Sequence, residues 1–140
     1  MDEKVRDVMT PDPIALPSTA TLVEAARTMR DNSIGDVLVV ADGRLQGMVT
    51  DRDIVTHAIA DSLDPTTTTV ADISSSTMVT MTPDQEAAQA VELMRSHAIR
   101  RVPVVDENGQ PVGMVTLGDL AVELDSRSAL AEISAAPPNA

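Results

Sequence analysis

The sequence predicts an α/β or α+β fold made of two related repeats, each a mixed three-stranded sheet with helices packed against it. Two observations carry this prediction. The segments 47–54 and 113–120 share the frame Gly-Met-Val-Thr-x-x-Asp-aliphatic. Earlier positions also match, as Val5 does with Val70 at an offset of 65 residues, and one inserted residue makes the later offset 66. A repeat of this length in a chain of 140 residues accounts for the whole architecture.

Each repeat is expected to run strand, helix, strand, strand, helix. In the first repeat, residues 13–16 form a short extended segment, and Ser18 and Thr19 cap the start of a helix. The helical spacing of apolar residues predicts a buried stripe of Leu22, Ala26 and Met29.

The helix of the second repeat has a sharper predicted start. Thr82 is a cap residue, Pro83 stands at the first helical position, and Gln85 completes a capping box. The corresponding buried stripe is Ala87, Val91 and Met94.

Two aliphatic runs, residues 37–40 and 102–105, predict strands that are covered on both faces. Each run leads into a dipeptide that favours a tight turn, Asp42-Gly43 in the first repeat and Asn108-Gly109 in the second. A parallel crossover through the first helix followed by this hairpin gives the mixed sheet.

The boundaries follow from turn signals. Leu63-Asp64-Pro65 ends a helix and begins a short linker. The first repeat is therefore assigned to residues 1–66 and the second to 67–127, with 128–140 forming the end of a C-terminal helix and a frayed tail. Each half is too small to bury a sufficient core alone, so the halves should share one.

Composition excludes several classes of protein. A formal net charge of −12 without a basic stripe argues against nucleic acid as a partner. Cysteine is absent, which excludes disulfides and Cys-based zinc sites, and no apolar run is long enough to span a membrane. A cytoplasmic location is the expectation. Aromatic residues are also absent, so a bound base could not stack on a ring.

The repeated motif has two interpretations. Thr50 with Asp53, and Thr116 with Asp119, have the spacing of a capping box at the start of a helix. The same geometry places a hydroxyl and a carboxylate beside unpaired backbone donors, and a carboxylate can accept hydrogen bonds from the two hydroxyls of a ribose. Both interpretations remain open from local chemistry.

The two motifs, each after a Val-rich strand, together with the segment 100–105, resemble a tandem pair of cystathionine β-synthase (CBS) domains. The resemblance covers about Val5 to Leu124 and is strongest at the motifs. The segments 50–55 and 63–65 are further similar to small stand-alone CBS pairs, including hypoxic-response proteins of actinobacteria.

The resemblance implies a Bateman module with two clefts between its repeats, where adenosine-containing ligands bind. AMP, ADP, ATP or S-adenosylmethionine would be regulatory ligands, and no cofactor would be required. The ligand-binding positions implied are Asp53 and Asp119 for ribose, Thr50 and Thr116 for ribose or phosphate, Arg100 and Arg101 for phosphate, and Pro103, Val79 and Ile14 for the base.

The two clefts should differ. Gly35, Asp36 and Leu38 stand in the first repeat where the second has Arg100, Arg101 and Pro103. Guanidinium groups bind phosphate whereas a carboxylate repels it. Arg52 is another candidate phosphate contact, although a solvated side chain at the first helical turn is the more common role.

These expectations define a regulatory module, not an enzyme, that signals by population shift through self-association as a homodimer or through a separate effector protein. The alternative is a ligand-free, stress-associated scaffold for protein interactions. The sequence contains no nucleophile or phosphate-loop signature. The two histidines, His57 and His97, lie in different repeats and have no neighbouring Cys or paired acidic residues, which argues against a structural metal site.

Overall fold

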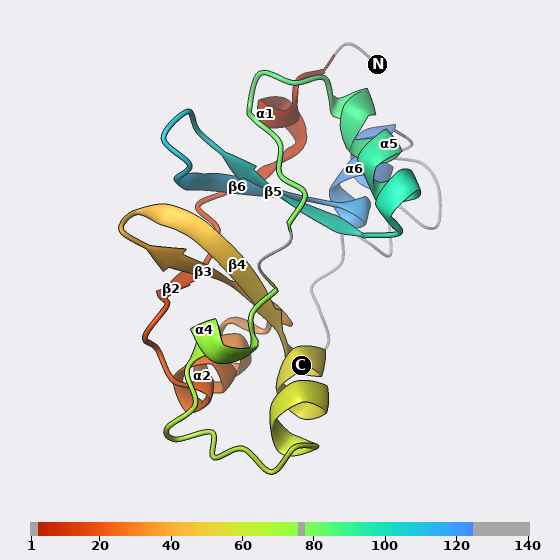
Figure 1. Ribbon diagram of the computed structural model, residues 1–140. Helices are drawn as coiled ribbons and strands as arrows, with labels where there is room; N and C mark the ends of the chain where they lie inside the picture. Colours follow the sequence, from red (N-terminus) through yellow and green to blue (C-terminus); the bar gives the residue numbers. More distant parts are fainter. Residues whose placement is uncertain (1–2, 76–77, 125–140) are drawn as a thin grey trace. The chain divides into compact units, whose positions relative to one another are not determined.

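The computed structural model describes residues 3–75 and 78–124, which divide into two compact units (Figure 1). One unit contains residues 14–75 and 78, and the other contains residues 3–13 and 79–124. The compact units therefore divide the chain at other points than the sequence repeats. The predicted tail at 128–140 lies outside the described residues.

The unit that holds the first repeat has a mixed three-stranded sheet in the order β2-β3-β4, as predicted. Strand β2 pairs parallel with β3, and β3 pairs antiparallel with β4. The helices α2 and α4, and the helix α3 that begins at the first motif, belong to this unit (Figure 1). The elements are β2 (Ala15–Pro17), α2 (Leu22–Asn32), β3 (Asp36–Ala41), β4 (Arg44–Thr50), α3 (Asp51–Asp53), the π-helix η1 (Ile54–Ile59) and α4 (Val70–Ile73).

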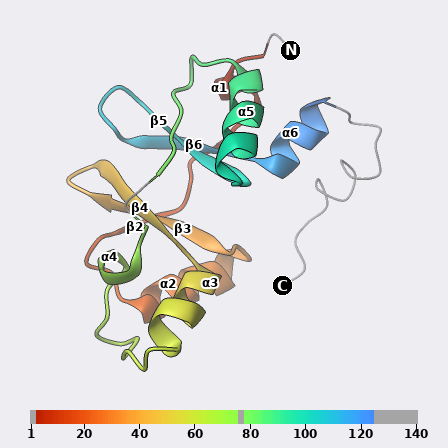
Figure 2. The ribbon, with the colours of Figure 1, turned by 45° about the vertical axis from the view of Figure 1, so that its right-hand side comes forward.

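The other unit has a sheet in the order β1-β6-β5, covered by helices that lie side by side in Figure 2. Its elements are α1 (Val5–Val8), β1 (Thr10–Pro11), α5 (Ala87–His97), β5 (Arg101–Val105), β6 (Pro111–Thr116) and α6 (Leu117–Leu124). Its two pairs of named strands are antiparallel, and the parallel pairing predicted for the second repeat is present only as an isolated bridge.

The parallel pairing of this second unit is reduced to one bridge between Met81 and Val104. In the first repeat, the equivalent ladder continues because the Ser18 N–H donates to Val40 O at 2.9 Å. The residue at that place in the second repeat is Pro83, which has no N–H to donate. The ladder stops there, and the third strand of this sheet is β1, which pairs with β6 on the opposite edge.

The short first helix of each repeat packs in the unit of the other repeat. Helix α1 places Val5 in the core of the unit that holds the second repeat, and the Val5 N–H donates to Gln85 O at 2.8 Å. Helix α4, which opens the second repeat, places Val70 in the core of the first, and its N–H donates to Ala20 O at 2.8 Å. Both valines are fully buried, so each core is completed by a segment from the other repeat.

Helix α2 begins later than predicted. Its N-cap is Thr21, whose hydroxyl accepts a hydrogen bond from the Glu24 N–H at 3.2 Å. Ser18 and Thr19 instead lie in a turn that the Ala20 N–H closes by donating to Pro17 O at 2.9 Å. A residue held in that turn cannot also cap the helix.

Helix α5 also begins later, at Ala87, with Glu86 and Gln89 forming its capping box. The predicted partners Thr82 and Gln85 do contact each other, because the Thr82 N–H donates to Gln85 Oε1 at 2.8 Å. The Gln85 N–H returns to Thr82 O at 3.2 Å, so this segment is a separate turn before the helix.

The later starts rotate the buried faces slightly. Ala26 is exposed and Val91 is only half-buried, so Ala25 and Ala90 take their predicted places in the core. The observed stripes are Leu22, Ala25 and Met29 in α2, and Ala87, Ala90 and Met94 in α5.

The predicted hairpin in the first repeat turns on Asp42 and Gly43, with φ of 54° and 76°. In the second, Gly109 alone has a positive φ, 79°, because the inserted residue lengthens the turn. There the Gln110 and Asn108 N–H groups both donate to Asp106 Oδ1 at 2.9 Å.

The segment after η1 is held in place by Asp64. Its carboxylate accepts the Thr66 hydroxyl at 2.6 Å and the Thr66 N–H at 2.9 Å. These bonds favour the charged form and hold the pKa of Asp64 below its usual value of 3.8. Backbone bonds from Leu22 to Thr68 and from Val23 to Pro65 then fix the segment against α2.

Candidate ligand-binding site

Both repeated motifs form reciprocal capping boxes. The Thr50 N–H donates to Asp53 Oδ2 at 2.9 Å, and the Asp53 N–H donates to Thr50 Oγ1 at 3.0 Å. Thr116 and Asp119 make the same two bonds at 2.9 and 3.0 Å. The capping interpretation is thus confirmed, and it fixes both carboxylates at the end of a strand where they keep further acceptor capacity.

The residues at the start of β3 and of β5 lie beside the motif of their own repeat. Arg101 is opposite Thr116 in the β5–β6 register, and the Leu117 N–H donates to Arg100 O at 2.8 Å. In the first repeat, Asp36 is opposite Thr50. The second motif therefore has two arginines in its neighbourhood where the first has a glycine and an aspartate.

The glycine that opens the motif frame allows a close approach by the exchanged segments. A Cβ at Gly47 would lie 2.5 Å from Ser75 O, which follows α4. A Cβ at Gly113 would meet Met9 Sδ and would lie 3.1 Å from Thr10 O. In each unit, a segment of the other repeat thus lies against the motif strand, and this packing explains the glycine without a direct role in ligand binding.

The predicted base-lining residues lie in both units. Pro103 is opposite Met114 on the sheet face away from the core residues Val102 and Val104. Val79 is half-buried in the same unit, whereas Ile14 belongs to the other unit and packs at the edge of its core. Their role in binding a base stays a prediction.

Two further side chains adjoin the first motif. Arg52 is exposed, as expected of a solvated residue in the first turn. His57 Nε2 lies 4.0 Å from Asp53 Oδ1. At the same place in the second repeat stands Glu123, so the two carboxylates have neighbours of different charge.

Sequence reasoning missed Thr10 as a site residue. Its hydroxyl lies 3.4 Å from Asp119 Oδ1 and 3.5 Å from Oδ2. The signal was available, because Thr10 and Ser75 are both hydroxyl residues at the repeat offset of 65. Each pairs with the Met of its adjoining motif strand, Met114 or Met48.

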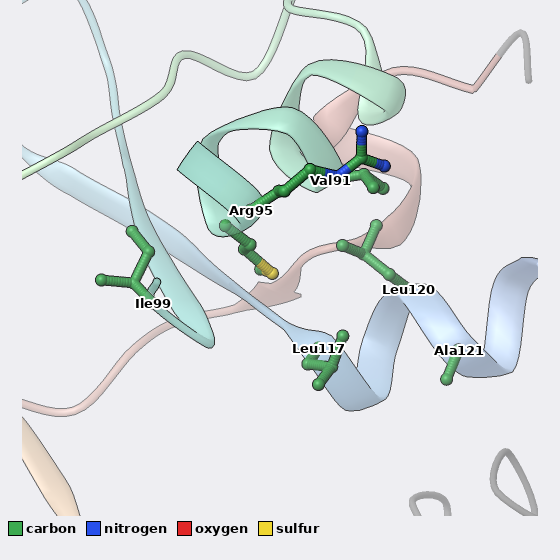
Figure 3. A pocket seen from close by; sticks show the side chains of 7 residues that line it. Val91, Arg95, Ile99, Leu117, Leu120 and Ala121 are labelled. Carbon is green, nitrogen blue, oxygen red and sulfur yellow. The ribbon is translucent and has the colours of Figure 1, made fainter. Parts of the chain in front are cut away.

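The helices that follow the motifs leave apolar side chains exposed. Leu117 in α6 is 50% exposed, and Val55 and Ile59 in η1 are 59% and 54% exposed. Leu117 borders an apolar groove of about 350 Å³ between α5 and α6 (Figure 3). Val91, Met94, Arg95, Ile99, Leu120 and Ala121 complete its lining.

A hollow at the equivalent place in the first repeat has about 340 Å³. It lies between α2 and η1, so the duplication extends to this surface. Its lining comprises Leu22, Val23, Ala26, Arg27, Arg30, Ile54, Ile59 and Pro65.

Within residues 3–75 and 78–124, no three His, Cys, Asp or Glu side chains gather as a metal site. His97 Nδ1 lies 3.2 Å from Leu93 O at the end of α5. The helices of this described part are all too short or too polar to cross a membrane.

Comparison with known proteins gives two relatives matched over most of their length and one matched over a small part. The chain is 40% identical to the CBS domain-containing protein YhcV of Bacillus subtilis, over 93% of this chain and 94% of that protein. It is 36% identical to hypoxic response protein 1 of Mycobacterium tuberculosis, over 85% and 83%. A match to homoserine O-acetyltransferase of Methanocorpusculum labreanum, at 33% identity, covers 84% of this chain and only 23% of that enzyme.

Solved structures share the fold. Hypoxic Response Protein I, crystallised with two coordinated zinc ions, has a TM-score of 0.78 at 35% identity, over 86% of this chain and 98% of that one. The CBS domain protein PAE2072 of Pyrobaculum aerophilum, complexed with AMP, has a TM-score of 0.76 at 32% identity, over 95% and 99%.

The CBS domain pair of protein MJ0100, in complex with 5′-methylthioadenosine and S-adenosyl-L-methionine, has a TM-score of 0.79 at 26% identity, over 91% and 100%. PAE2072 and MJ0100 are thus complexes with adenosine-containing ligands on the same fold as this chain. The CBS domain model matches residues 5–60 and 70–126, which contain both motifs. The chain therefore belongs to the CBS domain family, as a tandem pair.

Proposed function

We propose that this protein is a non-catalytic regulatory module that binds an adenosine nucleotide, and that AMP binds first at the motif of the second repeat. The observation that carries the proposal is the placement of Arg100 and Arg101 beside the Thr116–Asp119 capping box. The AMP complex of PAE2072 supports the ligand class. The relatives named for CBS domains or for a hypoxic response support a regulatory role.

The second motif offers complementary groups for both ends of a nucleotide. Asp119 has acceptor capacity for the two ribose hydroxyls beyond its bonds to the motif. Arg100 and Arg101 offer guanidinium groups, which bind phosphate by charge-assisted and often bidentate hydrogen bonds. Thr116, whose hydroxyl already accepts the Asp119 N–H, can donate to ribose or phosphate.

The first motif is a poorer site for phosphate. Three carboxylates, those of Asp36, Asp51 and Asp53, lie at its strand end and first helical turn. Arg52, the arginine within this motif, is exposed. Repulsion between these carboxylates and a phosphate lowers affinity there. We expect the first repeat to bind an uncharged adenosine or S-adenosylmethionine in preference to AMP.

Signalling is proposed to pass through self-association into a homodimer. The apolar groove beside α6 (Figure 3) and the equivalent hollow beside η1 give one chain two surfaces of the same chemistry. Leu117 and Ile59 are half-exposed at these surfaces. A second copy of the chain would cover such a surface, and a nucleotide that favours self-association would shift the dimer population.

Titration calorimetry tests the proposal with AMP, ADP, ATP, S-adenosylmethionine and reduced nicotinamide nucleotide. We expect AMP to release heat and to raise the melting temperature. Arg100→Gln or Arg101→Gln should weaken AMP binding by about 10- to 100-fold, the range for a charged hydrogen-bonding partner. Arg44→Gln, which changes an exposed arginine at the start of β4, is the matched control.

The same titration separates the two motifs. Asp119→Ala should abolish AMP binding, whereas Asp53→Ala should leave it within a few-fold of the wild type. If neither variant changes AMP affinity, the two carboxylates are helix caps only. If no ligand gives heat or a thermal shift, a ligand-free interaction scaffold becomes the better description.

A further inference from the structure

Strand β1 brings a hydroxyl to the second motif from the far end of the chain. Thr10 Oγ1 lies 3.4 Å from Asp119 Oδ1 and 3.5 Å from Oδ2, across 109 positions of sequence. Thr10 is itself exposed. Its hydroxyl is therefore accessible to a solute that reaches the same carboxylate.

The position of Thr10 is fixed by the packing on either side of it. Val5 and Val8 of helix α1 are buried in the core of this unit. Pro11 is opposite Gly113 in the β1–β6 register, where the missing Cβ lets the segment approach. Thr10 is thus held by an anchored helix and by a strand pair, so its hydroxyl is preorganised.

The contact with Asp119 leaves room for a ligand. At 3.4 and 3.5 Å, the hydroxyl lies at the outer limit of a hydrogen bond, whereas the Thr116 N–H holds Asp119 Oδ2 at 2.9 Å. A carboxylate has about four lone-pair sites, so a diol can bind without breaking the capping box. A threonine hydroxyl can both donate to the carboxylate and accept from a ribose hydroxyl.

Charge orients a nucleotide at this place. A polar hollow of about 340 Å³ beside Asp119 has Asp7 and Glu123 in its lining, which disfavour a phosphate on the α1 side. Arg100 and Arg101 favour it on the side of β5. The ribose edge of a nucleotide would then face β1.

We propose that Thr10 is a ribose-contacting residue of the second motif, so that the N-terminal segment of the first repeat completes the nucleotide site of the second. The inference rests on the proposed function and adds to it a residue outside the motif frame. Ser75 stands at the corresponding place against the first motif strand, which indicates that a hydroxyl is part of both site frames.

The test measures AMP binding by calorimetry for the wild type, Thr10→Val, Thr10→Ser and the control Thr67→Val. Thr67 has a hydroxyl contact of the same 3.4 Å length, to Asp64 O, but belongs to the other unit. We expect Thr10→Val to bind AMP about tenfold more weakly, equivalent to ~1.4 kcal/mol. Thr10→Ser should retain affinity within about threefold, and Thr67→Val should be unchanged.

A ligand cycle distinguishes ribose contact from a structural effect. The wild type and Thr10→Val are each titrated with AMP, 2′-deoxy-AMP and 3′-deoxy-AMP. If Thr10 contacts the ribose, removal of one of these hydroxyls from the ligand should cost the wild type several-fold more affinity than it costs Thr10→Val. Melting temperatures check that both proteins are folded.

The outcomes separate this inference from the proposed function. No AMP binding by the wild type would overturn both. Equal AMP affinities for wild type and Thr10→Val would overturn the Thr10 assignment alone. A weaker Thr10→Val with the same deoxy-ligand costs as the wild type would make Thr10 a structural residue and would also overturn it.

Discussion

The two motif glycines predict an unequal cost of the same mutation. At Gly47, a new Cβ would lie 2.5 Å from the backbone oxygen of Ser75 and 3.0 Å from Ser74 Oγ. At Gly113, the closest atom is Met9 Sδ, the far end of a flexible side chain. A backbone oxygen can move only with its main chain, whereas a methionine side chain can change rotamer.

The magnitudes follow from these neighbours. Inserting a methyl group into a packed site costs typically about 1–3 kcal/mol. Gly47→Ala should fall at the upper end, about 2–3 kcal/mol, because Ser75 must shift and Ser74 adds a second contact. Gly113→Ala should cost less, about 1–2 kcal/mol, since Met9 is half-buried and can move aside and the nearest backbone atom, Thr10 O, lies at 3.1 Å instead of 2.5 Å.

Urea unfolding followed by far-ultraviolet circular dichroism measures these costs, because the chain has no Trp or Tyr for fluorescence. Met9→Ala combined with Gly113→Ala should be less damaging than the sum of the single changes. An equal or larger cost at Gly113, or additivity with Met9→Ala, would refute the close-approach reasoning.

Three further outcomes are expected. Asp53→Ala and Asp119→Ala should each lower the free energy of unfolding by about 1 kcal/mol through loss of the capping box. Thermal unfolding without ligand measures this loss, and an unchanged stability would contradict the capping role. Ala98→Gly should raise the free energy of unfolding by about 1 kcal/mol, because Ala98 ends α5 with a φ of 53°, a conformation that costs glycine less than alanine. An unchanged urea midpoint would contradict this prediction. The pKa of Asp64 is lowered in the folded state, so its carboxylate stabilises the fold above pH ~3.8 and loses this effect as the pH falls through the folded-state pKa. The difference in unfolding free energy between wild type and Asp64→Asn should therefore become smaller in acid. A difference that becomes larger in acid would contradict the lowered pKa.

The duplicated frame was enough to predict the repeats, the strand cores and the capping boxes, because each depends on local pattern and spacing. Helix starts were less predictable. Thr82 and Gln85 have the residue types of a capping box and do bond to each other, but the parallel bridge at Met81 places them in a turn before α5. Long-range pairing decided between two locally acceptable structures.

The candidate site divided in the same way. The two members of each motif pair are three residues apart, so spacing alone predicted that Thr50 bonds to Asp53 and Thr116 to Asp119. Thr10 reaches Asp119 only because β1 joins the sheet of the other repeat, and the one sequence signal, a hydroxyl residue at the repeat offset in Thr10 and Ser75, does not say which strand it joins.

The exchanged helices have a consequence for any attempt to divide the molecule. A fragment ending near residue 66 would carry Val5 without the core that buries it and would lack Val70 for its own. Neither half would have a complete core alone, but this fragment and the one that begins after it should complement each other when mixed. An ancestral single repeat would have met the same need by lending its first helix to a second copy, so gene fusion would have turned an obligate pair into one chain.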